Sequence, residues 1–150
     1  MSASEQSLWK WLKRGWDEVP GNRLQYTRVE NSASSGMPDV EACHLGAQVW
    51  LELKVADRPS SPETRVDFKH LRPKQVEFLH NRWLVGGRAW MLLRVDGLFK
   101  SVYLLPGRDA RRVLRGMTER ELSRASGVQP TAGPLDILRC ASGYTLDFLR

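Results

Sequence analysis

The sequence predicts a single α/β domain in which a mixed sheet is flanked by helices. Its 150 residues fit one compact domain and are enough to bury a hydrophobic core. Apolar residues recur with a helical period near the N-terminus and again over residues 72–85, whereas residues 24–55 and 88–105 alternate as strands do. We expect the core of the domain to span about residues 4–105, with a C-terminal extension over about 106–150.

The first expected element is a helix over residues 4–17, which Pro20 and Gly21 follow as a stop signal. One broad side of this helix is apolar and carries Leu8, Trp9, Trp11, Leu12 and Trp16. Three indoles on one short helix are more than a small domain is sure to bury. We therefore expect some of them to face a second subunit, although a place in the core is the ordinary role of such a stripe.

Three strands are expected next, in the segments LQYTRVE (24–30), DVEACHL (39–45) and AQVWLELKV (47–55). The turn at Gly46 is so short that the last two must be antiparallel. A polar loop over 56–71 leads to a helix that Pro73 opens and Gly86 ends. A hairpin over 88–95 and 98–105 and two short helices complete the assignment, which stops at Ser126.

Composition and charge narrow the function. The net charge of +6 favours a polyanionic partner, nucleic acid first. Two cysteines, Cys43 and Cys140, cannot form a disulfide framework and are expected to be small buried side chains. No apolar run reaches the length of a membrane span, and the N-terminus lacks the order of a signal peptide. We expect a cytoplasmic protein with no membrane partner.

The strand over 47–55 carries two charged residues, Glu52 and Lys54, within an otherwise mostly apolar run. Alternation puts Val49, Leu51 and Leu53 on one face, and Glu52 and Lys54 side by side on the other. Asp39 opens the neighbouring strand and can reach the same side. Two converging carboxylates suit Mg²⁺ or Mn²⁺, which polarises phosphate and lowers the pKa of bound water. The simpler interpretation is a cross-strand ion pair on the solvent face of a sheet.

A family resemblance favours the metal site. Pro38–Asp39 followed by Glu52–Leu53–Lys54 resembles the PD-(D/E)xK nuclease motif. The segments RVENSASSGMPDV, VWLELKV and LRPKQVEFL, in that order, resemble the VRR-NUC branch of that superfamily. The resemblance covers about residues 28–95 and implies a restriction-endonuclease-like fold.

Site roles follow from that resemblance. It implies that Asp39, Glu52 and the backbone carbonyl of Leu53 bind the metal, that Lys54 positions the attacking water, and that Gln75 lies near the site on the following helix. Many members of the superfamily also use an acidic residue upstream, often on the first helix.

The sequence offers four residues for that upstream position, namely Glu5, Asp17, Glu18 and Glu30. Glu30 is favoured, because the antiparallel pairing of its strand would bring it close to Asp39. A plain surface role for Glu30 remains open.

The expected function is metal-dependent hydrolysis of DNA, as an Mg²⁺- or Mn²⁺-dependent endonuclease. The resemblance implies branched substrates such as Holliday junctions, and a homodimer, because a junction offers two symmetric strands. A sequence-specific restriction or homing endonuclease and a non-catalytic DNA-binding module are the alternatives. Further phosphate contacts could come from the loop that carries Arg58, Arg65, Lys69 and His70, and from Arg108, Arg111, Arg112 and Arg115.

Overall fold

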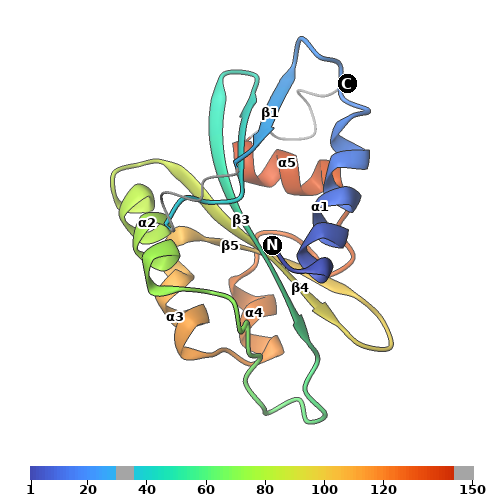
Figure 1. Ribbon diagram of the computed structural model, residues 1–150, viewed down its shortest axis with the longest axis vertical. Helices are drawn as coiled ribbons and strands as arrows, with labels where there is room; N and C mark the ends of the chain where they lie inside the picture. Colours follow the sequence, from blue (N-terminus) through green and yellow to red (C-terminus); the bar gives the residue numbers. More distant parts are fainter. Residues whose placement is uncertain (30–35, 144–150) are drawn as a thin grey trace.

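The computed structural model describes residues 1–29 and 36–143 and shows a five-stranded mixed sheet flanked by helices (Figure 1). The strands lie in sequence order and are β1 (Leu24–Arg28), β2 (Val40–His44), β3 (Ala47–Asp57), β4 (Arg88–Asp96) and β5 (Ser101–Pro106). Only β3 and β4 pair in parallel, and the other neighbours are antiparallel. The predicted α/β fold class, with a single domain and a mixed sheet, is confirmed.

The helices divide between the two faces of the sheet. They are α1 (Ala3–Trp16), α2 (Pro73–Leu84), α3 (Ala110–Arg115), α4 (Glu119–Ala125) and α5 (Pro134–Ser142), with a 3₁₀ turn, η1, at Gly107–Asp109. Figure 1 shows α1 beside α5 on one side, and α2, α3 and α4 on the other. The parallel pairing of β3 and β4 requires a crossover, which α2 supplies.

Strand alternation sends side chains into two separate cores. On β4, Trp90 and Leu92 pack towards α1 and α5, whereas Met91, Leu93 and Val95 pack towards α2, α3 and α4. The sheet is therefore covered on both faces, as a strand with a parallel neighbour usually is. Polar groups on β3 consequently enter a buried environment instead of a solvated face.

The predicted boundaries hold to within one or two residues where the period is clear. The helix expected over 4–17 begins and ends one residue earlier, and β3 continues two residues beyond its expected end. The unassigned segment after Ser126 contains α5. Its apolar residues Ile137, Leu138 and Ala141 belong to the same core as α1.

The stripe of tryptophans on α1 is mostly internal. Trp16 is 1% exposed and Trp9 is 8% exposed, and both meet the ring of Tyr26 edge-on. The indole N–H of Trp16 donates to the carbonyl of Pro134 at 2.9 Å, which ties α1 to the start of α5. Only Trp11 of the three remains partly exposed, so the stripe itself gives little support for a second subunit.

No helix in the ranges 1–29 and 36–143 is both long and apolar enough to cross a bilayer.

Candidate active site

The edge of β3 opens where β2 ends, and Asp39 occupies the opening. The last register pair between the two strands is Val40 with Leu51. One step further, the backbone N–H of Leu53 donates to Oδ2 of Asp39 at 2.8 Å, so the carboxylate replaces the missing strand. The N–H and C=O of a residue in an extended strand point to the same side. The carbonyl of Leu53 therefore faces the same open edge.

Glu52 is fully buried on the face of β3 that packs against α2. Its Oε1 accepts a hydrogen bond from Nε2 of Gln75 at 2.9 Å and lies 3.3 Å from Nζ of Lys54. Its Oε2 is buried and has no hydrogen-bond partner among the described residues. A buried carboxylate oxygen without a partner is costly, which indicates an oxygen that serves a ligand.

The first turn of α2 orients Gln75. Pro73 suits the first helical position, where no backbone donor is needed. Oε1 of Gln75 accepts from the backbone N–H of Arg72 at 3.0 Å, so its amide nitrogen is left to donate to Glu52. Helix geometry thereby fixes a donor against the carboxylate of the central strand.

Lys54 lies between two buried carboxylates. Its Nζ is 3.3 Å from Oε1 of Glu52 and 3.4 Å from Oε1 of Glu5, and all three side chains are less than a tenth exposed. Glu5 also completes a capping box with Ser2, whose N–H donates to Oε2 of Glu5 at 2.7 Å. The N-terminus of α1 is thus bound to the centre of the site.

The two glutamates differ in their electrostatics. Burial raises the pKa of Glu52 well above its ordinary value; the nearby Asp39 raises it further, and Lys54 only partly opposes this. Burial would also raise the pKa of Glu5, but the hydrogen bonds from Ser2 and the charge of Lys54 hold it below its ordinary value. Asp39 and Glu52 are therefore the pair whose repulsion a bound cation would relieve.

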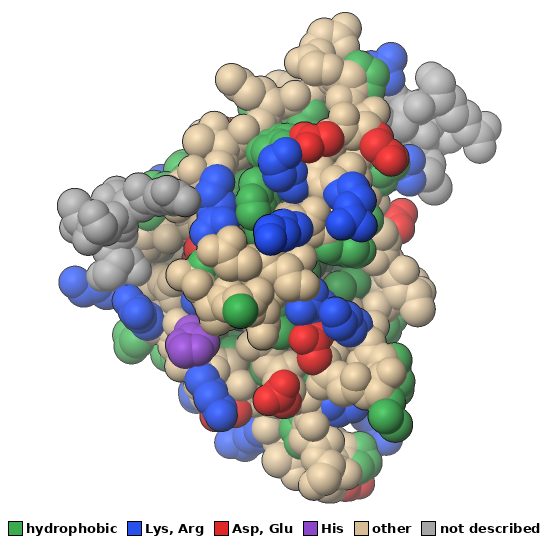
Figure 2. Space-filling view, turned by 45° about the vertical axis from the view of Figure 1, so that its right-hand side comes forward, with side chains coloured by type: hydrophobic (Ala, Val, Ile, Leu, Met, Phe, Trp, Pro, Cys, Tyr) green, Lys and Arg blue, Asp and Glu red, His purple; other side chains and the backbone are tan. Residues whose placement is uncertain are grey.

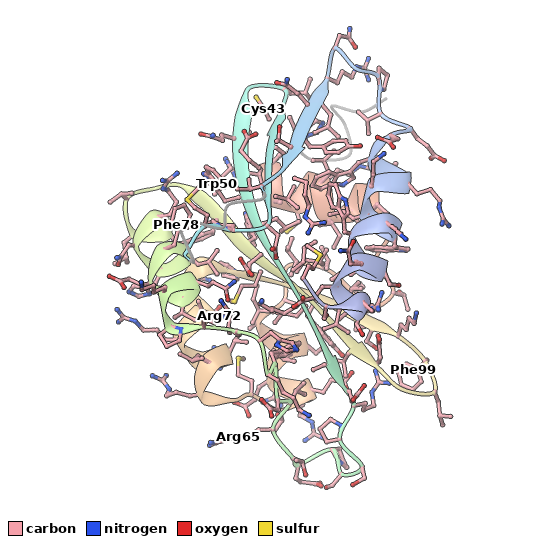
Figure 3. The ribbon with its side chains drawn as sticks, in the orientation of Figure 1. Cys43, Trp50, Arg65, Arg72, Phe78 and Phe99 are labelled. Carbon is pink, nitrogen blue, oxygen red and sulfur yellow. The ribbon has the colours of Figure 1, made fainter. Side chains whose placement is uncertain are left out.

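A cavity of about 410 Å³ opens in front of these groups. It is lined by Met1, Ser2, Glu5, Val29, Met37, Asp39, Lys54, His70, Arg72 and Gln75, with Glu52 buried behind them. Figure 3 marks Arg72 at the N-terminal end of α2. His70 and Arg72 give the rim a basic character, which suits an anionic ligand.

The donors available to a metal are two carboxylates and one carbonyl. Within the ranges 1–29 and 36–143, no three His, Cys, Asp or Glu side chains form a complete metal-binding group. Asp39, Glu52 and the carbonyl of Leu53 are nevertheless hard oxygen donors at one point of the sheet, and Oε2 of Glu52 lacks a partner. Such a set fits Mg²⁺, which keeps several waters and needs few protein ligands.

The upstream acidic candidates lie in different places. Glu5 lines the cavity, whereas Asp17 pairs with Lys13 at 2.7 Å and Glu18 is exposed. Glu30, which the sequence favoured, lies outside the described residues. Its neighbour Val29 donates a backbone hydrogen bond to the carbonyl of Asp39 at 2.7 Å.

The position of Glu5 has a signal in the sequence. The pattern Ser2-x-x-Glu5 is a capping box, which predicts that the carboxylate folds back over the helix start. The antiparallel strand pairing that favoured Glu30 does not predict where the first helix begins relative to the sheet, so it could not place Glu5 at the cavity.

Several other residues considered in the sequence do not line the cavity, namely Arg58, the two cysteines and the arginines of α3. Arg58, in the polar loop, donates from Nε to Glu119 at 2.8 Å and from Nη1 to the carbonyl of Phe99 at 2.7 Å. It therefore fastens the loop to the hairpin and α4. Cys43 and Cys140 are free thiols and are half-buried. The arginines of α3 are exposed, and Arg112 forms an ion pair with Asp109.

The five-stranded mixed sheet with helices on both faces has a resolvase-like, restriction-endonuclease-like α/β fold. The solved structure of Hjc from Archaeoglobus fulgidus, a Holliday junction resolvase from an archaeal hyperthermophile, superimposes with a TM-score of 0.52. The match covers 85% of this chain and 94% of that chain at 19% sequence identity. This likeness establishes the fold. No protein-family model and no curated protein sequence matches the chain.

The buried Glu52 predicts a pH-dependent stability. The pKa of Glu52 is higher in the folded protein than in the unfolded chain, where it is 4.5. The stability that the protonated carboxyl contributes is therefore fully present below pH 4.5 and is lost as the pH rises through the folded-state pKa. Glu52→Gln removes this loss of stability at high pH, because the glutamine side chain does not ionise. The variant should therefore melt above the wild type at pH 8.

Thermal unfolding in EDTA at pH 5 and pH 8 measures this difference, with the exposed Glu18→Gln as the matched control. The gain should be larger at pH 8 than at pH 5. A Gln variant that melts below the wild type at pH 8 would contradict the assigned cost of burying the charge.

Proposed function

We propose that the protein is a metal-dependent endonuclease that hydrolyses phosphodiester bonds in DNA, and that it belongs to the VRR-NUC branch of the PD-(D/E)xK nucleases. The observation that carries the proposal is the buried Glu52, with an unpartnered oxygen, next to Asp39 at the open edge of β3. An ion pair on a solvated face does not account for this arrangement, since Glu52 is fully buried. The basic net charge and the basic rim of the cavity suit a polyanionic substrate.

Each residue has a role in this proposal. Asp39, Glu52 and the carbonyl of Leu53 would hold Mg²⁺ or Mn²⁺, which supplies charge stabilisation and a water of lowered pKa. Lys54, fixed by two carboxylates, orients the attacking water and stabilises negative charge on the phosphate. Gln75 keeps Glu52 in position by its hydrogen bond, and Arg72 and His70 contact the phosphate backbone at the rim.

Two other functions were considered from the sequence. A decayed, non-catalytic DNA-binding module is disfavoured, because the buried carboxylate of Glu52 next to Asp39 only lowers stability if no metal binds there. A sequence-specific restriction or homing endonuclease would need Arg or Asn side chains directed at base edges in the major groove. The substrate assay described below separates this alternative from a nuclease that recognises branched structure.

Removal of either metal carboxylate should abolish cleavage. Asp39→Asn and Glu52→Gln are expected to lower the rate at least about a hundredfold, since several kcal/mol of charge stabilisation are lost. DNA binding should be unchanged or stronger, because a negative charge facing phosphate is removed. The measurement is cleavage of linear duplex, single strand, flap and four-way junction in Mg²⁺ or Mn²⁺, with Glu18→Gln as control. Wild-type cleavage by either variant removes that residue from the metal site.

The upstream carboxylate is proposed to be Glu5, with Glu30 as the alternative. Glu5→Gln should lower the cleavage rate about tenfold or more, because its charge holds Lys54 and borders the cavity. Ser2→Ala is the matched control, since it weakens the helix cap by about 1 kcal/mol but keeps the carboxylate. A large loss in Glu30→Gln with none in Glu5→Gln would assign the role to the end of the first strand.

The preference for branched DNA and the homodimer form a further proposal, motivated by the family resemblance and by the symmetry of a junction. Sedimentation in dilute solution should give about twice the 17.1 kDa chain mass, and a four-way junction should outcompete linear duplex. A clean monomer with and without DNA excludes the dimer. Displacement of the junction by linear duplex at equal concentration excludes the branched-DNA preference but not the nuclease chemistry.

A further inference from the structure

A second cleft lies on the other side of α1 from the candidate active site. It has a volume of about 840 Å³ and is bounded by α1, the β4–β5 hairpin and the segment from Pro130 to Ala132. Lys10 and Arg14 line it from the helix, together with Lys100 from the hairpin. Arg14 is nine positions from Glu5, which is half a turn out of phase at 3.6 residues per turn. The cleft and Glu5, which borders the candidate active site, therefore lie on opposite sides of the same helix.

Three of the four positive charges that line this cleft are uncompensated by any described residue. Its charged lining residues are all basic, namely Lys10, Arg14, Arg94 and Lys100. Lys10, Arg14 and Lys100 are exposed and form no ion pair with any residue in the ranges 1–29 and 36–143. Figure 2, which brings the α1 side forward, shows Lys and Arg side chains gathered in the middle of this face. Cations grouped without partners form a surface that attracts a polyanion.

An indole lies beside these cations. Trp11 lines the cleft and is partly exposed, whereas Trp9 and Trp16 are buried against Tyr26. Within the described part of the chain, the ring of Trp11 has no aromatic partner. Some of its surface packs on the core, so it is held in place. An anchored ring beside several cations is the combination with which proteins bind single-stranded nucleic acid.

The walls of the cleft are tied together without a ligand. Arg94 is 5% exposed; its guanidinium binds Asp96 at 2.7 and 3.1 Å and reaches the carbonyl of Ser4, at the start of α1, at 3.4 Å. On β5, next to Arg94 in the sheet, the N–H of Val102 donates to the carbonyl of Pro130 at 3.0 Å. A preformed cleft loses less conformational entropy on binding than one that must close.

We propose that this cleft binds an unpaired strand of nucleic acid, with a base stacked on Trp11 and phosphates held by Lys10, Arg14 and Lys100. Its volume falls within the roughly 300–1,000 Å³ of small-ligand sites, which suits nucleotides of a single strand. The inference goes beyond the proposed cleavage, since none of these residues is assigned to catalysis. It adds a contact for the single-stranded part of a substrate.

The test uses fluorescence anisotropy of a labelled oligo-dT with the full chain in EDTA, so that no cleavage occurs. Trp11→Leu should weaken binding at least about fivefold through the lost stacking, and Trp11→Phe should retain most of the affinity. Lys10→Ala and Lys100→Ala should each weaken binding and reduce the salt slope by about 0.7 for the lost phosphate contact. Lys13→Ala is the matched control, because Lys13 is exposed on the same helix but pairs with Asp17 outside the cleft.

Three results would overturn the inference: wild-type affinity in Trp11→Leu, equal losses in Lys13→Ala and Lys10→Ala, or equal competition by poly-glutamate and unlabelled oligo-dT. The last result would indicate a general polyanion surface without base stacking. Asp39→Asn serves as the link to the proposed nuclease, since it should lose cleavage but bind oligo-dT at least as tightly as the wild type. An inactive wild type that still binds oligo-dT through Trp11 would refute cleavage and leave the cleft assignment intact.

Discussion

The hydrogen bond from the backbone of Leu53 to the carboxylate of Asp39 is the contact on which the site depends. The sheet needs a partner for β3 beyond the last pair with β2, and a side chain supplies it in place of a backbone carbonyl. This substitution leaves the edge of β3 open, so that the carbonyl of Leu53 and the carboxylate of Asp39 meet at the same edge. A longer β2 would satisfy the ladder equally well and would cover the cavity. The end of one strand therefore determines whether the sheet has a site at all.

A buried acid on the central strand lowers stability, and the surrounding contacts limit that loss. Oε1 of Glu52 is bound by Gln75 and lies near Lys54, whereas Oε2 has no partner among the described residues. A fold selected for stability alone would place an apolar residue there, as it does at Leu51 and Leu53 on the other face. A strained electrostatic arrangement inside an otherwise well-packed core is where function is expected.

The sequence predicts the parts of this structure that local patterns determine. The helical period of residues 4–17, the alternation of 47–55 and Pro73 before Gln75 locate α1, β3 and α2 to within two residues. The pairing of Lys54 with Glu5 is different, because it joins residues about fifty positions apart through the packing of α1 on the sheet. Strand pairing alone predicts that Glu30 lies closer to Asp39 than Glu5 does. The burial of Glu52 likewise could not be predicted from local patterns. Alternation alone allows the polar face of β3 to be exposed to solvent, and it is buried because α2 packs over it.

The first helix connects the two surfaces of the molecule. Glu5 binds Lys54 on one side of α1, and Lys10 and Arg14 line the second cleft on the other. The carbonyl of Ser4 is held by Arg94, and the indole of Trp16 by the carbonyl of Pro134, so both ends of the helix are fixed to other elements. A rigid helix that carries a carboxylate of the candidate site and lines a cationic cleft keeps the distance between them constant. Under the two proposals, a strand held in the cleft would lie at a fixed offset from the Asp39–Glu52 pair, which would be a geometric basis for recognising DNA by its shape and not by its bases.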